Sequence, residues 1–342
     1  MTKVAVIGCG YWGKNLVRNF HQLGALAAVH DADPATGAAM SAEFAVAALD
    51  LETILGSDIP AVVIAAPAEH HAFLVRRALQ AFKHVFVEKP LALDLDEAEQ
   101  LCALAEANKR VLMVGHLLQY HPGFLKVKEL CDTGALGRLR YAYSNRLNFG
   151  KLRREENVLW SFAPHDVSMI LALAGDLPQA VWATASCYLQ PTMADMTTVH
   201  LRFAGALGGH IFVSWLNPFK EQKLVVVGER AMAIFDDGLD WSEKVQLFPH
   251  QVEWRGNIPV ARKAAGVPVP LERREPLAEE CRHFLAGIAL GASIRTDGRE
   301  GLDILRVLDA AERSMRSGTV EYLAGPPSGA EPGSWTQTVL MG

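Results

Sequence analysis

Short apolar runs alternate with amphipathic stretches over roughly the first 120 residues. Uninterrupted apolar runs are typical of strands buried on both faces, and apolar positions three or four residues apart are typical of helices. The predicted strands are Val4–Ile7, Ala27–His30, Ala61–Ala66, His84–Val87 and Val111–Gly115, and the predicted helices are Tyr11–Leu23, His71–Phe82 and Asp94–Asn108. Asp94 is a candidate N-cap, with Glu97 three residues later. The alternation predicts a doubly wound parallel sheet, an α/β Rossmann domain.

The pattern changes after about residue 137, where longer segments alternate between apolar and polar residues. Such alternation favours an antiparallel sheet with one covered face. The predicted strands are Arg138–Asn148, Val181–Tyr188, Thr197–Phe203, Gly208–Leu216, Lys223–Gly228, Ala231–Asp236 and Lys244–Phe248, and the predicted helices are Pro164–Ala174, Leu277–Leu290 and Arg299–Ser317.

Three segments follow from these patterns. Residues 1–120 are predicted to form the Rossmann domain. Residues 121–324 are predicted to form an α+β domain with a large, open, mainly antiparallel sheet, whose last helices pack back on the first domain or stay with the second. Residues 325–342 are rich in Gly, Pro and Ser and are predicted to be a loose tail.

Composition and charge exclude several classes of function. The net charge of −5 gives no basic surplus for nucleic acid or anionic lipid. No run approaches the roughly 20 apolar residues of a membrane span. The five cysteines are scattered without a Cys-x-x-Cys, which is typical of reduced thiols, and the twelve histidines lack zinc-site spacing. We expect a cytoplasmic protein without a metal that binds neither nucleic acid nor membrane.

A glycine motif, G-x-G-x-x-G, spans residues 8–13. It follows the first predicted strand directly and opens the first predicted helix, which is the context of a dinucleotide site. Gly8 allows the tight turn, Gly10 lets the backbone approach a pyrophosphate, and Gly13 lets the helix pack on the strand. Tyr11 and Trp12 lie at the same helix N-terminus, which favours bound phosphate.

Asp31 lies 18 residues after Gly13, at the end of the second predicted strand. A carboxylate in that position accepts hydrogen bonds from the adenosine ribose. No Arg or Lys stands near Asp31, so a 2′-phosphate would meet uncompensated negative charge. These positions predict NAD rather than NADP, the alternative being a glycine turn followed by a surface Asp.

The tripeptide Glu88-Lys89-Pro90 ends the fourth predicted strand. The carboxyl ends of strands line the ligand crevice of a doubly wound sheet. Lys89 is therefore predicted to point toward the nicotinamide, with Glu88 and Pro90 fixing its direction. The alternative is a surface lysine at a strand end.

These motifs resemble the Gfo/Idh/MocA family of oxidoreductases over roughly residues 3–318. The matching pieces are Gly8–Gly13, Ala65–Pro67 with His71, Lys83–Pro90, Val114–His116, Pro164–Asp166 and Thr296–Ala311. The resemblance implies NAD-dependent hydride transfer at a sugar carbon, with Lys89 and His165 as catalytic residues. It also places Ala66, Pro67, His71, Glu88 and Lys89 at the cofactor. Many members carry an Asp four residues before the His, where this chain has Ser161.

The stretch from Asn145 to Trp160 contains four basic residues among polar amides. Arg guanidinium groups bind phosphate bidentately, as a sugar linked to a nucleoside diphosphate requires. The alternative is a solvated loop whose arginines are neutralised by Glu155 and Glu156. The candidate substrate contacts are Lys89, His116, Tyr120, Arg146, Asn148, Arg153 and His165.

This stretch also resembles family members that oxidise nucleotide sugars at C3. The resemblance implies oxidation of UDP-N-acetylglucosamine to the 3-keto sugar, which a 3-aminotransferase then uses in lipid A and lipopolysaccharide biosynthesis. Open alternatives are the corresponding uronate of O-antigen synthesis, a free sugar or inositol, and an NAD-binding sugar sensor without turnover. The open sheet face further predicts a homodimer or homotetramer.

Overall fold

The computed structural model describes residues 2–150, 152–154 and 156–323, so the predicted tail lies outside the described residues. The chain forms two compact units. The first contains the described residues up to His121 together with Arg274–Leu305, and the second contains Pro122–Arg273 and the described residues from Arg306 onward. The second predicted domain is therefore interrupted, because the chain returns to the first unit for about thirty residues.

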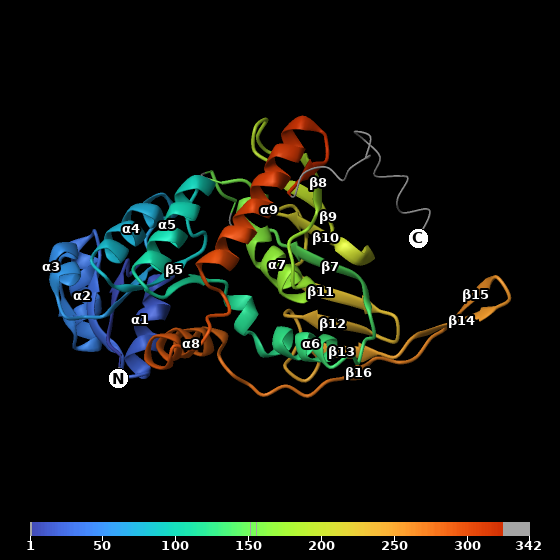
Figure 1. The fold of residues 1–342 in the computed structure, drawn as a ribbon, viewed down its shortest axis with the longest axis horizontal. Coiled ribbons are helices and arrows are strands. Elements are labelled where there is room, and N and C mark those ends of the chain that lie inside the picture. Colours follow the sequence, from blue (N-terminus) through green and yellow to red (C-terminus); the bar gives the residue numbers. More distant parts are fainter. Residues whose placement is uncertain (1, 151, 155, 324–342) are drawn as a thin grey trace. The chain divides into compact units, whose positions relative to one another are not determined.

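The first unit is built on a six-stranded parallel sheet in the order β3-β2-β1-β4-β5-β6, which confirms the predicted Rossmann fold. Its elements are β1 (Val4–Ile7), α1 (Gly13–Gln22), β2 (Leu26–His30), α2 (Pro34–Phe44), β3 (Ala47–Ala48), α3 (Leu51–Gly56), β4 (Ala61–Ile64), η1 (Ala68–His70), α4 (His71–Gln80), β5 (His84–Glu88), α5 (Leu95–Ala107), β6 (Leu112–Gly115), η2 (Leu117–Tyr120) and α8 (Pro276–Leu290). Helices α4 and α5 lie together on one side of the sheet, and α1 and α8 lie together on the other (Figure 1). The strand order reverses between β1 and β4, which is where such folds bind ligands.

Helix α8 completes the core of the first unit. The ring of Phe284 lies edge-on to Phe20 of α1 at 6.4 Å and to Phe86 of β5 at 5.8 Å. Leu277 and Cys281 are buried in the same cluster. Buried aromatic contacts of this kind stabilise a core beyond the area that they remove from water.

Helices α2 and α3 are absent from the sequence prediction, although each has a start signal. Asp33 accepts hydrogen bonds from the backbone N–H groups of Ala35 and Thr36 at 3.2 and 3.1 Å, and Pro34 follows it. Asp50 accepts from the N–H of Thr53 at 2.8 Å. Such N-caps define a helix start even where the apolar spacing is weak.

The second unit contains a nine-stranded sheet in the order β16-β13-β12-β11-β7-β10-β9-β8-β17. Its elements are α6 (Pro122–Asp132), β7 (Leu139–Leu147), α7 (Val158–Ala174), β8 (Ala180–Ser186), β9 (Met196–Arg202), η3 (Ala204–Ala206), β10 (Gly208–Ser214), β11 (Glu221–Gly228), β12 (Met232–Asp236), β13 (Val245–Phe248), β14 (Gln251–Arg255), β15 (Ile258–Arg262), β16 (Val267–Pro268) and β17 (Glu321–Tyr322), and α9 (Gly298–Ser317) is shared between the units. Strands β7 and β10 are parallel and the other neighbours are antiparallel. The predicted open, mainly antiparallel sheet is confirmed.

One face of this sheet is covered by α7, as the alternating pattern predicts. A side chain at Gly209 of β10 would lie 3.4 Å from Ile170 of α7. Helix α7 begins six residues before the predicted start at Pro164, because the side chain of Asn157 accepts a hydrogen bond from the N–H of Trp160 and caps the helix there. No helix in the described part of the chain has the length and apolar character needed to cross a membrane.

Candidate active site and family

In the glycine loop between β1 and α1, two glycines have no space for a side chain and the third faces open space. Gly8 has a φ of 89°, and a Cβ at Gly13 would lie 1.9 Å from the carbonyl oxygen of Gly8. A Cβ at Gly10, in contrast, would meet no described heavy atom within 4 Å. The loop therefore packs α1 tightly on β1 and leaves its backbone accessible at Gly10, as pyrophosphate binding requires.

Asp31 lies beside this loop. One carboxylate oxygen accepts a hydrogen bond from the backbone N–H of Cys9 at 2.6 Å, and the other accepts from the N–H of Asp33 at 2.9 Å. Both bonds fix the carboxylate at the end of β2. The loop and Asp31 together fit the pyrophosphate and ribose of a dinucleotide.

Glu88 joins the end of β5 to the glycine loop. Its Oε1 accepts a hydrogen bond of 2.5 Å from the indole Nε1 of Trp12. Gly115, its neighbour on β6, leaves room for the carboxyl group, because a Cβ there would lie 3.0 Å from Oε2. Burial raises the pKa of Glu88 to about 7, although the hydrogen bond from Trp12 and the charge of Lys89 act in the opposite direction. The carboxyl group beside Lys89 therefore titrates near neutral pH.

His71 braces the segment that follows Lys89. Its Nδ1 lies 2.6 Å from the carbonyl oxygen of Pro90, and its Nε2 lies 2.8 Å from that of Ala66. The ring is buried, and this burial lowers its pKa. Because both ring nitrogens lie against backbone carbonyls, His71 supports the strand-end loops, and its contact with the cofactor stays a prediction.

A buried polar cluster lies behind the strand ends of the first unit. The Nε2 of His116 is 3.9 Å from Oε2 of Glu300, whose Oε1 accepts a 2.5 Å hydrogen bond from Gln119. Glu280 is fully buried, and its carboxylate oxygens have no hydrogen-bond partner among the described residues. Burial raises its pKa, and the charges of Glu88 and Glu300 raise it further. Glu280 was not among the residues predicted from the sequence, where its one signal is its place in the apolar stripe of α8.

His116 is expected to make the free energy of unfolding depend on pH. Burial lowers the pKa of His116 to about 3, and the charge of Lys89 acts in the same direction. Between about pH 3 and 6.5 the unfolded chain therefore binds more protons at this residue than the folded chain does. The contribution of neutral, buried His116 to the free energy of unfolding is complete above pH 6.5 and is lost as the pH falls. We expect His116→Gln to gain stability relative to the wild type, by at most about 1.4 kcal/mol per pH unit, as the pH falls from 6.5. Urea unfolding at several pH values measures this, and a pH-independent difference would contradict it.

Tyr120 lies in the core of the first unit. Its hydroxyl group is 3.1 Å from Oγ1 of Thr296 and 3.0 Å from Nδ1 of His283, and the guanidinium of Arg295 lies 4.9 Å above its ring. The side chain is only 2% exposed. Tyr120 therefore has a packing role in this structure, and its contact with the substrate stays a prediction.

Arg146 is occupied by a buried ion pair in the second unit. Its Nε and Nη2 donate to Asp166 at 2.7 and 3.2 Å, and the hydroxyl group of Ser144 donates to the same carboxylate. Asp166 is fully buried and Arg146 nearly so. Its guanidinium therefore neutralises Asp166 in this structure, and the contact of Arg146 with phosphate stays a prediction that would require it to leave this ion pair.

The other candidates of the second unit lie nearer the surface. Arg153 forms an ion pair with Glu156 at 3.1 Å, as the alternative of a self-neutralised loop expects. Asn148 donates its backbone N–H to Ser214 at 3.1 Å. His165 lies half-buried on α7, one turn after Ser161, whose buried hydroxyl group has no hydrogen-bond partner among the described residues. Lys151 and Glu155 lie outside the described residues.

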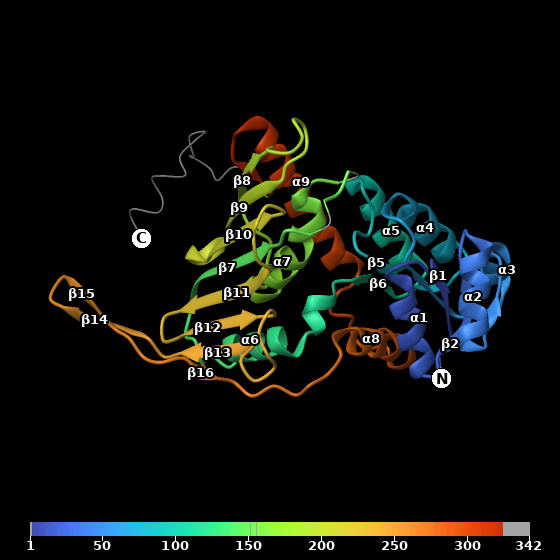
Figure 2. The ribbon, with the colours of Figure 1, turned by 180° about the vertical axis from the view of Figure 1, so that it is seen from behind.

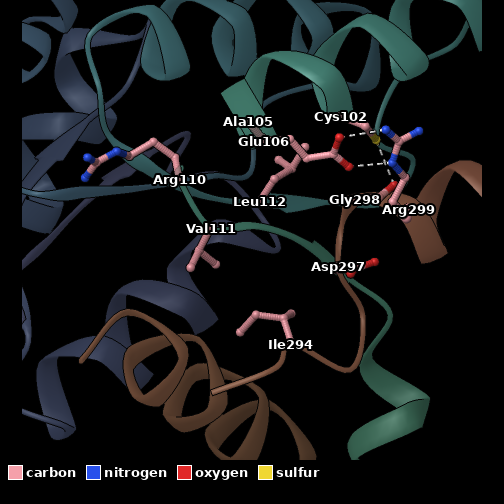
Figure 3. Close-up of a pocket in the computed structure, with 10 residues that line it drawn as sticks. All are labelled: Cys102, Ala105, Glu106, Arg110, Val111, Leu112, Ile294, Asp297, Gly298 and Arg299. Carbon is pink, nitrogen blue, oxygen red and sulfur yellow. Dashed lines mark hydrogen bonds and ion pairs between the residues drawn. The ribbon is translucent and has the colours of Figure 1, made fainter. Parts of the chain in front are cut away.

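A cavity of about 200 Å³ lies elsewhere in the first unit (Figure 3). Its lining includes Val111 and Leu112, where β6 begins, whereas Glu88 and Gly115 end their strands. The cavity is therefore at the opposite edge of the sheet from the glycine loop. At its rim Arg299 donates to Glu106 at 2.7 and 2.9 Å. No three His, Cys, Asp or Glu side chains are grouped to hold a metal ion in the ranges that the structure covers.

Comparison with known families accounts for both units. Residues 2–116 match the model of the Gfo/Idh/MocA oxidoreductase family with an NAD-binding Rossmann fold, and residues 124–234 match the C-terminal domain of the same family. The chain belongs to the Gfo/Idh/MocA family. It is an NAD-dependent oxidoreductase, and its first unit is the NAD-binding domain.

Relatives of this Gfo/Idh/MocA protein have different substrates. Inositol 2-dehydrogenase from Rhizobium meliloti is 27% identical over 306 residues, which cover 85% of this chain and 89% of the relative. UDP-N-acetylglucosamine 3-dehydrogenase from Acidithiobacillus ferrooxidans is 27% identical over 308 residues, or 89% and 94% of the two chains. A solved structure of the latter, GnnA, superimposes with a TM-score of 0.82 at 25% identity and covers 92% of this chain and 97% of its own. Identity alone does not separate the two activities.

Proposed function

We propose that this Gfo/Idh/MocA oxidoreductase uses NAD⁺ to oxidise the C3 hydroxyl group of UDP-N-acetylglucosamine to a ketone. The observation that carries the proposal is the similarity to UDP-N-acetylglucosamine 3-dehydrogenase in both sequence and structure over most of each chain. The 3-keto sugar would feed a 3-aminotransferase of lipid A and lipopolysaccharide biosynthesis. The reaction would take place in the cytoplasm, a prediction that rests on the scattered free cysteines.

The residues of the first unit provide the chemistry on the protein side. Bound NAD⁺ supplies the hydride acceptor. The glycine loop would bind its pyrophosphate, and Asp31 would accept hydrogen bonds from its ribose. Lys89, at the end of β5, takes the proton of the substrate hydroxyl group as the general base. Glu88 lies beside it with a pKa of about 7, which suits a group that exchanges this proton with solvent. Trp12 and Gly115 hold Glu88 in place.

The second unit provides the remaining substrate contacts in this proposal. His165 is the candidate second acid–base group, a role that rests on the family resemblance and on the general ability of histidine to transfer protons. With Arg146 occupied by Asp166, Arg153 and Asn148 remain the candidates for binding the nucleotide. An exchange of partner from Glu156 to phosphate is feasible for Arg153, because a surface ion pair contributes little stability.

A second candidate activity is inositol oxidation, which the inositol 2-dehydrogenase of equal identity supports. The absorbance of NADH distinguishes these candidate activities when the protein is incubated with NAD⁺ and one of four substrates. The substrates are UDP-N-acetylglucosamine, its uronate, free N-acetylglucosamine and myo-inositol. We expect turnover with the neutral UDP-sugar. NAD binding without turnover of any sugar would instead favour a sensor.

Cofactor choice follows from Asp31. We expect Asp31→Asn to weaken NAD⁺ binding about tenfold, because a charge-assisted hydrogen bond to the ribose is lost. The preference of the protein for NAD⁺ over NADP⁺ should become smaller. Titration of both dinucleotides by protein fluorescence measures the two dissociation constants. Asp33→Asn is the matched control, because Asp33 caps α2 beside the same loop. Equal losses for NAD⁺ and NADP⁺ would contradict the assignment.

The open sheet face of the second unit supports the proposal of a homodimer or homotetramer. Four residues form one row in register across β7, β10, β9 and β8, namely Tyr143, His210, His200 and Trp182. The two imidazole rings stack at 5.0 Å, and the indole stacks on His200 at 5.2 Å. An aromatic face of this kind resembles the buried centre of an interface.

A further inference from the structure

Strands β14 and β15 form a hairpin that is separate from the nine-stranded sheet. They pair only with each other among the described strands. The hairpin is the tip of an arm that leaves the sheet between β13 and β16 (Figure 2). The hydrophobic pattern of these residues did not predict the hairpin.

The hairpin has one apolar and one mainly polar face. Val252 lies opposite Ala261, and Trp254 lies opposite Pro259. Side chains alternate between the faces of a strand, so these four residues share one face. On the other face Glu253 forms an ion pair with Arg262 at 2.7 Å.

The apolar face is uncovered by the described chain. Trp254 is 68% exposed and Val252 is 60% exposed. An isolated two-stranded hairpin is at best marginally stable in water, and a Trp side chain can bury about 150–250 Å². This hairpin therefore has the properties of an element that is completed by a second surface.

We propose that the apolar face of the β14–β15 hairpin docks on a second copy of this chain. Charge complementarity favours this occupant. The arm residues 251–263 contain three basic side chains and one acidic side chain, whereas the whole chain has a net charge of −5. The rest of a second copy therefore carries a net negative charge, which favours contact with the positively charged arm.

Symmetry strengthens the argument. In a two-fold dimer each copy contributes one hairpin and receives one, so the contact occurs twice. A stable interface buries about 800 Å² on each partner, more than one hairpin face provides. The two hairpins supplement the open sheet face. This inference specifies the assembly part of the proposed function and is independent of the substrate.

Photo-cross-linking between isotopically distinct copies tests the inference directly. Val252→p-benzoylphenylalanine places the probe on the apolar face, and Arg255→p-benzoylphenylalanine places it on the opposite face as the control. Each variant is prepared with natural and with ¹⁵N isotopes, mixed, allowed to exchange and irradiated. We expect mixed-isotope cross-linked pairs from position 252 and few from position 255. Cross-links only within one chain, or a monomer at all concentrations, would overturn the proposal.

A second variant measures the contribution of the contact. Trp254→Ser is expected to weaken self-association in sedimentation equilibrium about 30-fold, as for a central interface residue. Its melting temperature at low concentration should match the wild type, because Trp254 is exposed within the chain. An unchanged association constant would contradict the docking role. NADH formation by the same samples tests the dehydrogenase proposal separately. A protein that assembles through the hairpin but shows no turnover would contradict the dehydrogenase proposal and leave the docking proposal intact.

Discussion

Replacement of Lys89 by Met is expected to lower kcat/KM by a factor of about 10²–10⁴ while the NAD⁺ dissociation constant stays within a few-fold of wild type. Methionine keeps the apolar length of the side chain but cannot accept the hydroxyl proton. The glycine loop and Asp31, which we propose as the sites for the pyrophosphate and the ribose, are left in place by the substitution. Initial rates of NADH formation and a calorimetric titration with NAD⁺ measure the two quantities.

The control for this experiment is Lys128→Met. Lys128 lies on α6 and pairs with Asp132 one turn away, so its loss should leave the rate unchanged. A Lys89→Met enzyme with the wild-type rate would remove Lys89 from the mechanism. A variant that loses NAD⁺ binding in parallel with its rate would instead make Lys89 a cofactor-binding residue.

Replacement of Arg146 by Met is expected to lower the free energy of unfolding by about 3–5 kcal/mol, because it leaves Asp166 buried without its charged partner. The hydroxyl group of Ser144 still donates to Asp166, but it supplies no compensating charge. Urea unfolding at neutral pH measures the change. The double variant Arg146→Met/Asp166→Leu should recover much of the loss, because an apolar pair needs no charge compensation.

Arg153→Met serves as the matched control, because it removes an exposed pair with Glu156 and should cost less than about 1 kcal/mol. If Arg146→Met kept wild-type stability and raised only the KM of UDP-sugars, Arg146 would be a phosphate ligand after all. The structural role assigned to it would then be wrong.

The Rossmann domain was predictable from the sequence because its signals are local. The glycines at positions 8, 10 and 13 lie within six residues, and each of the five predicted strands is a mainly apolar run, whereas the two-residue strand β3 gave too short a signal to be predicted. The position of Asp31 follows from the same spacing, and its hydrogen bond to Cys9 places it where the sequence predicted.

Partners that are distant in sequence could not be predicted in the same way. Arg146 and Asp166 are twenty residues apart on a strand and a helix, and no local pattern pairs them. Tyr120 meets Thr296 and His283 only because the chain returns to the first unit. Ligand contacts were predicted for Arg146 and Tyr120 because their side chains are polar. In the structure both side chains are buried in the protein interior.

The most direct test of the central claim follows the hydrogen atom that leaves the substrate. UDP-N-acetylglucosamine with deuterium at C3 is incubated with the protein and NAD⁺, and hydroxylamine is included to trap the ketone and draw the equilibrium forward. Mass spectrometry then determines the isotope in the reduced cofactor. We expect one deuterium in the NADH and an oxime at C3 of the sugar. Reduced cofactor without deuterium, or turnover of myo-inositol with none of the UDP-sugar, would contradict it.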